Sequence, residues 1–164
     1  MIAIARHTDY AARLILHLAS LEPGARTPIA VVARQRRLPL AFVRRTLAPL
    51  VRAGIIETVR GQGGGIRLGR PAARISLLDL VRVMEGGVVL NPCVDTPMAC
   101  PLAVACPVNK AWCEATDTLS VSLGAVRFDR LANATEAAVA TDGYPRRSGR
   151  RSQPSPPAGR RRPG

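Results

Sequence analysis

Two short helical segments followed directly by a hairpin, within residues 27–68, constrain the fold of this 164-residue chain more than any other feature. Thr27 and Pro28 are typical of an N-cap and a first helical residue, so a helix is expected to open there. Pro39 opens a second helix, and Gly54 ends it because glycine readily adopts the left-handed conformation that follows many helices. The short connection between the two segments predicts a tight helix pair.

The segment after the helix pair predicts a β-hairpin. Residues 55–60 are β-branched and apolar with polar residues between them, residues 61–65 are mostly glycine, and residues 66–68 return to the strand pattern. Before the pair, residues 8–20 place apolar side chains on one helical face. The expected fold is therefore mainly α, with a winged helix-turn-helix DNA-binding domain.

The C-terminal half is predicted to be helical. Ser76 and Asp79 form a capping-box pattern that starts a helix, and Gly86 stops it. The stretch 108–140 is rich in Ala, Leu and Val, with a break expected around residues 124–129. Its first part is expected to be the long dimerisation helix of a homodimer. The expected parts are a DNA-binding domain (1–75), a connecting helix (76–91), a cysteine loop (92–107), a dimerisation region (108–142) and a disordered Arg/Pro-rich tail (143–164).

The formal net charge of +13 indicates a polyanionic partner, because arginines gain from neutralising phosphates and releasing their counterions. Seven arginines follow Gly143 with no acid among them, and removing their charge from the total leaves +6 on residues 1–142. Double-stranded DNA is the expected partner. No apolar run approaches the roughly 20 residues that span a bilayer, so we expect a cytoplasmic protein without a membrane partner. The sequence has no evident nucleophile–base pair or paired carboxylates, so an enzyme is not expected.

Five side chains are candidates for contacting DNA. Arg44 and Arg45 lie on the second helix of the pair, which fits the major groove. Arg60 and Arg67 flank the glycine loop that contains Gln62, so that Arg60 or Gln62 is expected to enter the minor groove. Plainer interpretations exist, since arginines on a helix surface are often only solvated and a triple glycine is often only a flexible turn. The glycines do not fit the nucleotide-binding motifs.

Three cysteines form the candidate metal site. Cys93, Cys100 and Cys106 are separated by six and five residues, and the last two are each followed by proline. Thiolates are the usual ligands of iron–sulfur clusters, and proline stiffens the loop. This pattern favours an iron–sulfur cluster, [2Fe–2S] or [4Fe–4S], over buried structural thiols or a zinc site, which usually contains closely spaced cysteine pairs. Cys113 lies about two helical turns beyond Cys106, roughly 10 Å away, and is expected to pack in the helix interface instead.

Together these motifs resemble the Rrf2 family of bacterial winged-helix regulators over residues 1 to about 132. The wing sequence in combination with the three cysteines is the most specific part of the resemblance. The residues that carry it are Thr8-Asp9-Tyr10-Ala11, GIIETVRGQGGGIRL at 54–68, Arg70-Pro71, Glu85-Gly86-Gly87 and the cysteines from Cys93 to Cys106. The resemblance implies a transcriptional regulator, in particular a repressor, whose affinity for its operator depends on an iron–sulfur cluster.

Within the family, the chain is most similar to the nitric-oxide-sensing repressors of the NsrR type. In some of these proteins the remaining cluster ligand is an acidic residue near the start of the partner subunit's first helix, and Asp9 matches that position. An equally weighted alternative is that Asp9 is a first-turn acid favoured by the helix dipole. The family's regulators of iron–sulfur biogenesis have a histidine where this chain has Asn109, which argues against that branch.

Two further interpretations stay open at the level of the sequence. One is a member of the same family that senses iron, redox status or cysteine metabolism. The other is a non-regulatory nucleic-acid-binding module that relies on its basic tail. Leu38-Pro39 in place of a polar helix cap, Pro49, Cys113 and the tail depart from the family pattern, and they leave the operator sequence and the role of the tail open.

Overall fold

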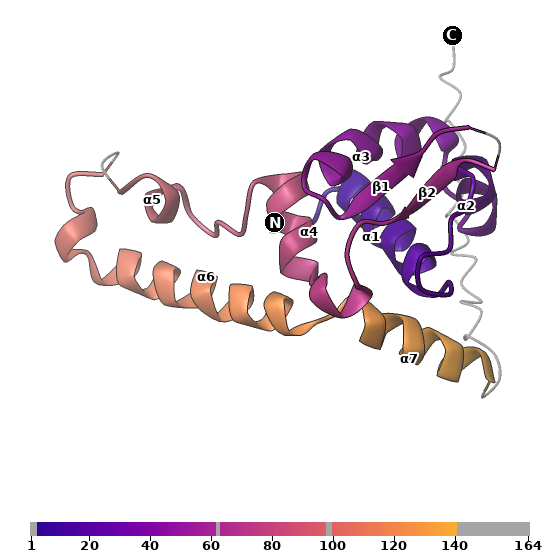
Figure 1. Ribbon diagram of the computed structural model, residues 1–164. Coiled ribbons are helices and arrows are strands. Elements are labelled where there is room, and N and C mark those ends of the chain that lie inside the picture. The colour runs from indigo at the N-terminus through magenta and orange to yellow at the C-terminus, as the bar shows by residue number, and fades with distance from the viewer. Residues whose placement is uncertain (1–2, 62, 98–99, 141–164) are drawn as a thin grey trace, which may run out of the picture.

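The computed structural model of the chain describes residues 3–61, 63–97 and 100–140. Gln62 and the predicted tail at 143–164 therefore lie outside the described residues. The elements run in the order α1 (Arg6–Ala19), α2 (Ile29–Gln35), α3 (Leu40–Arg52), β1 (Ile56–Val59), β2 (Gly65–Leu68), η1 (Ala72–Arg74), α4 (Leu77–Glu85), α5 (Pro92–Asp95), η3 (Ala103–Ala105), α6 (Pro107–Ala125) and α7 (Phe128–Ala140) (Figure 1). This is the mainly helical architecture with a two-stranded wing that the sequence predicts.

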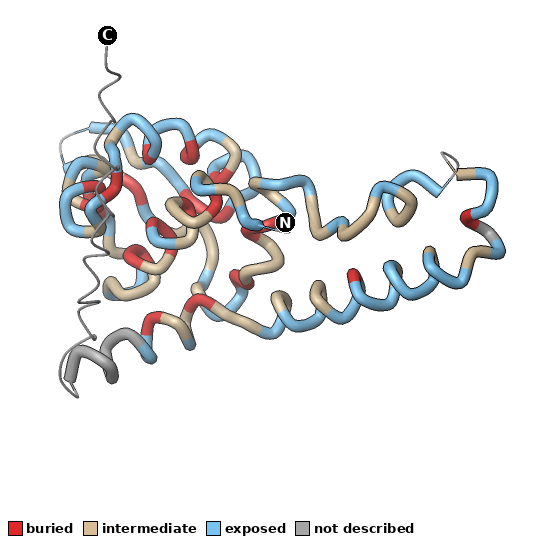
Figure 2. Tube along the Cα trace, turned by 180° about the vertical axis from the view of Figure 1, so that it is seen from behind, coloured by how far each residue is buried: buried red, intermediate tan, exposed pale blue. Residues whose placement is uncertain are grey.

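The hydrophobic core lies within the helical body, around α1. Leu14 and Ile15 of α1 are fully buried, together with Leu50 of α3 and Ile66 of β2, and Phe128 at the start of α7 joins the same cluster. Burying a side chain of this size contributes about 1.5–3 kcal/mol. Figure 2 shows that buried residues concentrate in this body, whereas α6 is mostly exposed or half-buried. The body that carries the helix pair and the wing therefore contains the hydrophobic core.

The start of α2 differs from the sequence prediction by a residue. Pro28, rather than Thr27, occupies the N-cap position, and no side chain caps the helix. Thr27 instead pairs with Ile66 of the wing: its N–H donates to the Ile66 carbonyl at 3.0 Å, and the Ile66 N–H donates back at 2.9 Å. This pairing holds the Thr27 backbone extended, so the helix begins only at Ile29. The wing is thus attached to the helix pair through backbone hydrogen bonds.

The wing is an antiparallel pair in which Ile56 lies opposite Leu68 and Val59 lies opposite Gly65. Gly65 has a structural role that the sequence does not reveal, because a Cβ atom at this position would stand 2.4 Å from the Thr27 carbonyl oxygen. Only glycine lets β2 approach Thr27 closely enough for the two hydrogen bonds with Ile66. Part of the glycine-rich loop is therefore required by the fold itself.

The predicted helix boundaries in the second half are confirmed. Ser76 and Asp79 form a reciprocal capping box at the start of α4, and Gly86 ends α4 in the left-handed conformation with φ +85°. The expected break also exists, because α6 ends at Ala125 and α7 begins at Phe128. At this break the Leu77 N–H donates to the Val126 carbonyl at 3.0 Å, which fixes the junction against the start of α4.

The cysteine loop and the first turns of α6 extend away from the body as an arm, which we define as residues 92–116 (Figure 1). Apolar side chains on α6 and beside it stay uncovered in the single chain, including Val121, whose side chain is 73% exposed, and Trp112. Within the described residues, no helix is both long enough and apolar enough to cross a bilayer.

Candidate nucleic-acid interface and cysteine loop

The two candidate arginines of α3 lie on its outer surface. Val43 and Leu47 are buried against the body, whereas Arg44 and Arg45 are both exposed. The helical period accounts for this division, since residues three to four apart share a face and the apolar positions take the inner one. Both side chains therefore lie on the outer face of α3, where the sequence predicts them.

The candidate residues of the wing have different surroundings. Arg60 follows β1 and is exposed. Arg67 is exposed too, but it is paired with Glu57: its Nε and one terminal nitrogen donate to the same carboxylate oxygen at 2.9 and 2.7 Å. Glu57 was not among the residues singled out in the sequence, although the hairpin register places it directly opposite Arg67. In the free protein Arg67 is thus partly neutralised.

A buried histidine connects α1 to the turn of the helix pair. His17 is 6% exposed, and the Nε of Arg36 donates to its Nδ1 at 3.3 Å. A terminal nitrogen of Arg36 also donates to the Ser20 hydroxyl at 3.4 Å. Burial and the nearby Arg36 charge lower the pKa of His17, because both disfavour a second positive charge. The ring is therefore held in the neutral form, and this position was missed by the sequence analysis.

The cysteine loop is attached to α6 through its first cysteine. The Asn91 side chain accepts from the N–H of Cys93, and the side-chain amide of Asn109 donates to the Cys93 carbonyl at 2.9 Å. Cys106 is the N-cap residue of α6. Cys113 lies on α6, as expected, and its sulfur contacts the Asn109 side-chain oxygen at 3.8 Å. All four cysteines are half-buried free thiols.

The donor chemistry of this loop suits an iron–sulfur cluster, since three thiols arise from one short segment. The described part of the single chain does not gather them, however: it contains no group of three or more His, Cys, Asp or Glu side chains placed to hold a metal ion. Asp9, in the first turn of α1, forms an ion pair with Arg13 at 2.8 Å. The ligand set expected from the sequence is therefore not assembled within one subunit.

A helix pair with exposed arginines on its second helix, followed by a basic hairpin, defines the class of winged helix-turn-helix DNA-binding proteins. The model of the Rrf2 family, described as an iron-dependent transcriptional regulator, matches residues 4–134. The chain belongs to the Rrf2 family. It is a DNA-binding transcriptional regulator and not an enzyme, which agrees with the sequence prediction and argues against the non-regulatory module.

Known relatives support this placement. The protein aau3 of Rhizobium meliloti (strain 1021) is 35% identical over 133 residues, which cover 80% of this chain and 85% of that protein. The structure of CymR, the global cysteine regulator of B. subtilis, superposes with a TM-score of 0.68 at 22% identity, covering 82% of this chain and 98% of CymR. The structure of T. potens IscR gives a TM-score of 0.65 at 18% identity, covering 87% of this chain and 93% of IscR. At these identities the two structures establish the fold.

Proposed function

We propose that the chain is a homodimeric repressor that acts on DNA in the cytoplasm and loses its operator when nitric oxide reacts with an iron–sulfur cluster bound by each subunit. The observation that carries the proposal is the arm: one projecting segment presents Cys93, Cys100 and Cys106, and Asn109 fixes its first cysteine to α6. The wing sequence and the cysteine spacing resemble those of NsrR-type repressors. When bound, a cluster supplies iron atoms that react with nitric oxide.

The three thiolates are the ligands that this proposal assigns to the cluster, and Asp9 of the partner subunit is the proposed fourth. Asp9 is half-buried, and its only ion pair among the described residues is the exposed i,i+4 pair with Arg13. Such exposed pairs contribute only about 0–1 kcal/mol. Arg13 therefore does little to hold Asp9 away from a stronger partner. The arm projects away from its own body (Figure 1), which leaves it open to a second subunit in this proposal.

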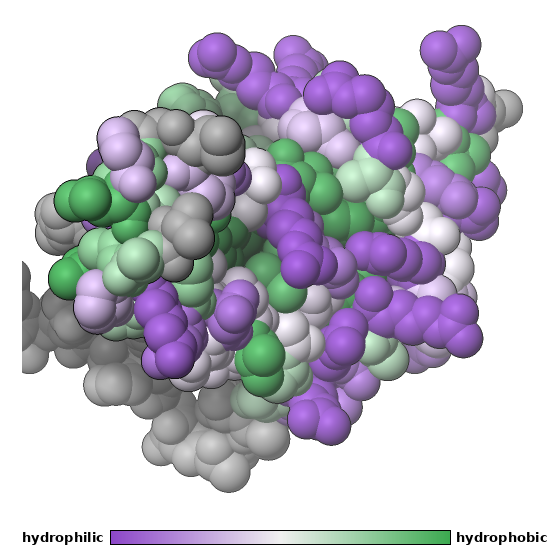
Figure 3. Space-filling view, turned by 90° about the vertical axis from the view of Figure 1, so that its left-hand side faces the viewer, coloured by the Kyte–Doolittle hydropathy of each residue, from purple (hydrophilic) through white to green (hydrophobic). Residues whose placement is uncertain are grey.

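A homodimer is proposed because a single chain leaves a substantial apolar surface uncovered. Seen from the end of the arm, hydrophobic side chains gather in the hollow between the arm and the body (Figure 3). A cavity of about 270 Å³ in this region is lined by Ile4, Val81, Val88, Leu119 and Leu123, among others. Contiguous apolar patches on a soluble protein typically mark an interface. A second copy of α6 is the proposed occupant.

The dimer proposal is tested by light scattering on the purified protein. We expect a dimer for the wild type and a monomer for Leu119→Glu, because Leu119 lines the hollow and the added charge would be buried in the interface. Thr118→Glu, its exposed neighbour on the same helix, is the matched control and should stay dimeric. A wild-type monomer at tens of micromolar would overturn the proposal.

The cluster proposal is tested on protein purified without oxygen. We expect brown protein with stoichiometric iron and sulfide, and we expect Cys93→Ala, Cys100→Ala and Cys106→Ala to lose the visible absorbance while Cys113→Ala retains it. Asp9→Ala should alter the spectrum if Asp9 is a ligand and leave it unchanged if Asp9 only stabilises the start of α1. Colourless wild-type protein with bound zinc would refute the cluster.

The signal is tested by titrating the anaerobic protein with nitric oxide while operator binding is followed. Loss of binding at about one to a few equivalents per cluster supports the proposal. The alternative is a regulator that responds to iron, redox status or cysteine metabolism. The description of the family as iron-dependent and the similarity of the fold to that of CymR support this alternative. Nitric oxide without effect, together with a response to iron chelation or to thiol oxidants, would select this alternative.

DNA contacts are proposed for Arg44, Arg45, Arg60, Gln62 and Arg67. We expect Arg44→Ala or Arg45→Ala to weaken binding to a duplex selected from random sequences by about 1–3 kcal/mol if the residue reads a base. Loss of a phosphate contact instead weakens all sequences alike and reduces the salt slope by about 1. Arg82→Ala, an exposed arginine of α4, is the matched control. Wild-type affinity in both α3 variants would remove α3 from the interface.

A further inference from the structure

One phenylalanine of the helix pair lies outside the hydrophobic core. The chain has two phenylalanines. Phe128 is 1% exposed and belongs to the core cluster, whereas Phe42 is 40% exposed. Phe42 lies in the first turn of α3, the second helix of the pair, which runs along the surface of the body (Figure 1). Single apolar side chains are common at protein surfaces, so the position of Phe42 and its contacts matter more than its exposure.

The ring of Phe42 is held by Tyr10 of α1. The two ring centroids lie 5.6 Å apart, and the ring planes are nearly perpendicular, at 89°. Tyr10 itself is half-buried and packs against the core cluster. Aromatic rings favour this edge-to-face arrangement because the positive edge of one ring meets the negative face of the other. The Phe42 side chain is therefore oriented before a partner binds, which lowers the entropic cost of a contact.

Phe42 occupies the part of α3 that meets base edges in a helix-turn-helix protein. The second helix of this class enters the major groove, and residues near its N-terminus contact the bases. The first residue of α3 is Leu40, so Phe42 is the third. Arg45 follows three residues later, and residues three apart are neighbours on a helix surface. Phe42 therefore lies beside one of the proposed DNA contacts.

The charges of α3 indicate DNA, rather than a second protein surface, as the partner of Phe42. The helix contains three arginines and no acidic residue. Arg44 and Arg45, which follow Phe42 within one turn, are both exposed. Such a group of cations is complementary to phosphates, whereas the centres of protein–protein interfaces are depleted of charge. An apolar ring among these arginines is thus placed to meet a base while its neighbours meet the backbone.

The chemistry of the Phe42 side chain limits what it can contact on DNA. Its ring has neither a charge nor a strong hydrogen-bonding group, so it cannot pair with phosphates or with the polar atoms of the base edges. In the major groove, thymine presents a C5-methyl group, and apolar side chains that include phenylalanine contact it. Thymine is therefore the base whose edge complements Phe42.

We propose that Phe42 is a specificity-determining residue whose ring contacts the C5-methyl group of a thymine in the operator, and that Tyr10 is its positioning residue. The contact makes thymine the required base at that position of the operator. The proposal rests on α3 as the DNA-contacting helix of the proposed function. It is independent of the cysteines and of the signal.

The test replaces thymine by deoxyuridine, which lacks the C5-methyl group and keeps the same hydrogen-bonding atoms. The probe is a DNA duplex selected from random sequences with the full-length wild-type protein, and each of its thymines is replaced in turn. Fluorescence anisotropy measures the dissociation constants at one fixed salt concentration, because affinity depends on salt. For the wild type, we expect deoxyuridine at one or more thymine positions to weaken binding about fourfold, the effect of burying one methyl group.

Two variants assign this discrimination to the aromatic pair. Phe42→Ala should bind the thymine and deoxyuridine duplexes equally at the sensitive position, and α3 should still form because alanine is the strongest helix former. Tyr10→Leu keeps an apolar side chain against the core but removes the ring contact, so the discrimination should fall below about twofold. Val51→Ala, an exposed apolar position about 13 Å further along α3, is the matched control and should keep the fourfold discrimination.

Three results would overturn the proposal. The first is a selected duplex in which no thymine is sensitive to deoxyuridine. The second is undiminished discrimination in Phe42→Ala while Arg44→Ala and Arg45→Ala weaken binding, which would remove only the role of Phe42. The third is wild-type affinity in both arginine variants, which would place α3 itself outside the interface and would contradict the proposed DNA contacts as well.

Discussion

Arg67 and Glu57 lie directly opposite each other in the wing, and the guanidinium group of Arg67 donates two hydrogen bonds to a single oxygen of Glu57. Both side chains are close to half exposed, so this pair is solvated and contributes little to stability. For the proposed contact of Arg67 with DNA the pair matters more, since Glu57 would place a negative charge where a phosphate has to approach Arg67. We therefore expect the wing to attract DNA less than its arginine content indicates.

Replacing Glu57 by glutamine should strengthen operator binding. Glu57→Gln removes the repulsion and frees Arg67, so we expect a salt dependence of log K that is steeper by about 0.9, the contribution of one phosphate contact. Fluorescence anisotropy between 50 and 200 mM salt measures it. Glu114→Gln, which removes the same charge from the exposed Lys110 pair on α6, controls for net charge. Equal slopes for the two variants would contradict the assigned role of Glu57.

The close approach of the wing to Thr27 makes Gly65 difficult to replace. We expect Gly65→Ala to lower the free energy of unfolding by about 1–3 kcal/mol, because the new methyl group would overlap backbone atoms that cannot rotate away. Gly124→Ala is the comparison: its Cβ would meet only Leu78 Cδ2 at 3.5 Å, and alanine is favoured in helices by about 0.5–1 kcal/mol. Urea unfolding should show the two variants shifted in opposite directions, and a neutral Gly65→Ala would refute the close approach.

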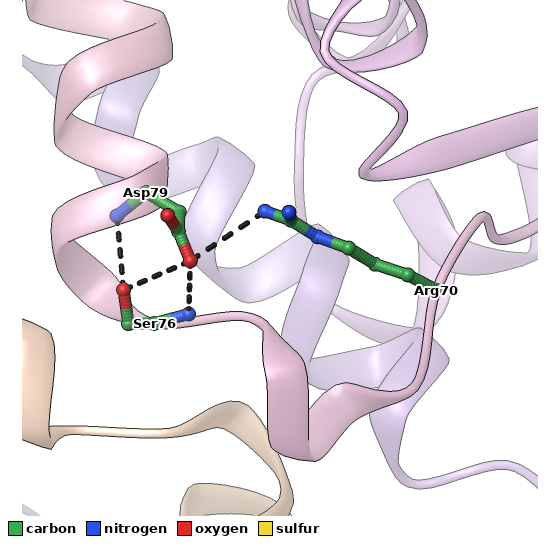
Figure 4. A network of polar contacts seen from close by, with 3 residues as sticks. All are labelled: Arg70, Ser76 and Asp79. Atoms are coloured by element: carbon green, nitrogen blue, oxygen red, sulfur yellow. Dashed lines mark hydrogen bonds and ion pairs between the residues drawn. The ribbon is translucent and has the colours of Figure 1, made fainter.

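The capping box of α4 provides a third prediction. The Ser76 hydroxyl accepts from the Asp79 N–H at 3.1 Å, and Asp79 Oδ2 accepts from the Ser76 N–H at 2.9 Å (Figure 4). Ser76→Ala should cost about 0.5–2 kcal/mol of stability, the usual range for a lost cap. Ser122→Ala, on the exposed side of α6, should stay within about 0.5 kcal/mol of the wild type in the same urea titration. Equal stabilities would mean that the cap contributes nothing.

The attachment of the cysteine loop to α6 depends on Asn109. Because its amide is the side-chain donor to the Cys93 carbonyl, Asn109→Ala should leave that carbonyl to water and loosen the turn around Cys93. We expect amide hydrogen exchange to rise several-fold in residues 93–96 and to stay unchanged in the wing. Asn133→Ala on α7 is the matched control. Unchanged exchange at 93–96 would show that the hydrogen bond does not restrain the loop.

The features that could be predicted from the sequence are those set by neighbouring residues. The capping box at Ser76 and Asp79, the stop after α3 at Gly54 and the break between α6 and α7 depend on residues within one or two turns. Even the Arg67–Glu57 pair follows from the hairpin register once the strands are placed. The class of protein was predictable for the same reason, since a helix pair and a wing occupy one continuous segment.

The features that could not be predicted arise between distant segments. The Thr27–Ile66 pairing joins residues 39 positions apart, and it moved the start of α2 away from a locally plausible cap. The burial of His17 depends on how α1 packs against α2 and is not set by its neighbours in sequence. The cysteine loop is the extreme case, because its side chains lie on an arm with few contacts to the body. Within the described part of the chain, no contact brings the three thiols together into one site.

The neutral state of His17 leads to a prediction about pH. Burial and Arg36 lower the folded-state pKa of His17 below its ordinary value of 6.5, so the unfolded chain takes up a proton first as the pH falls. Stability contributed by the neutral ring is present above pH 6.5 and declines progressively below it, until the pH reaches the folded-state pKa. His17→Gln retains an oxygen that accepts from Arg36 but has no titrating ring. Between pH 7.5 and 5, its melting temperature should therefore fall by less than that of the wild type. Parallel declines in the wild type and His17→Gln would mean that another group governs the acid sensitivity.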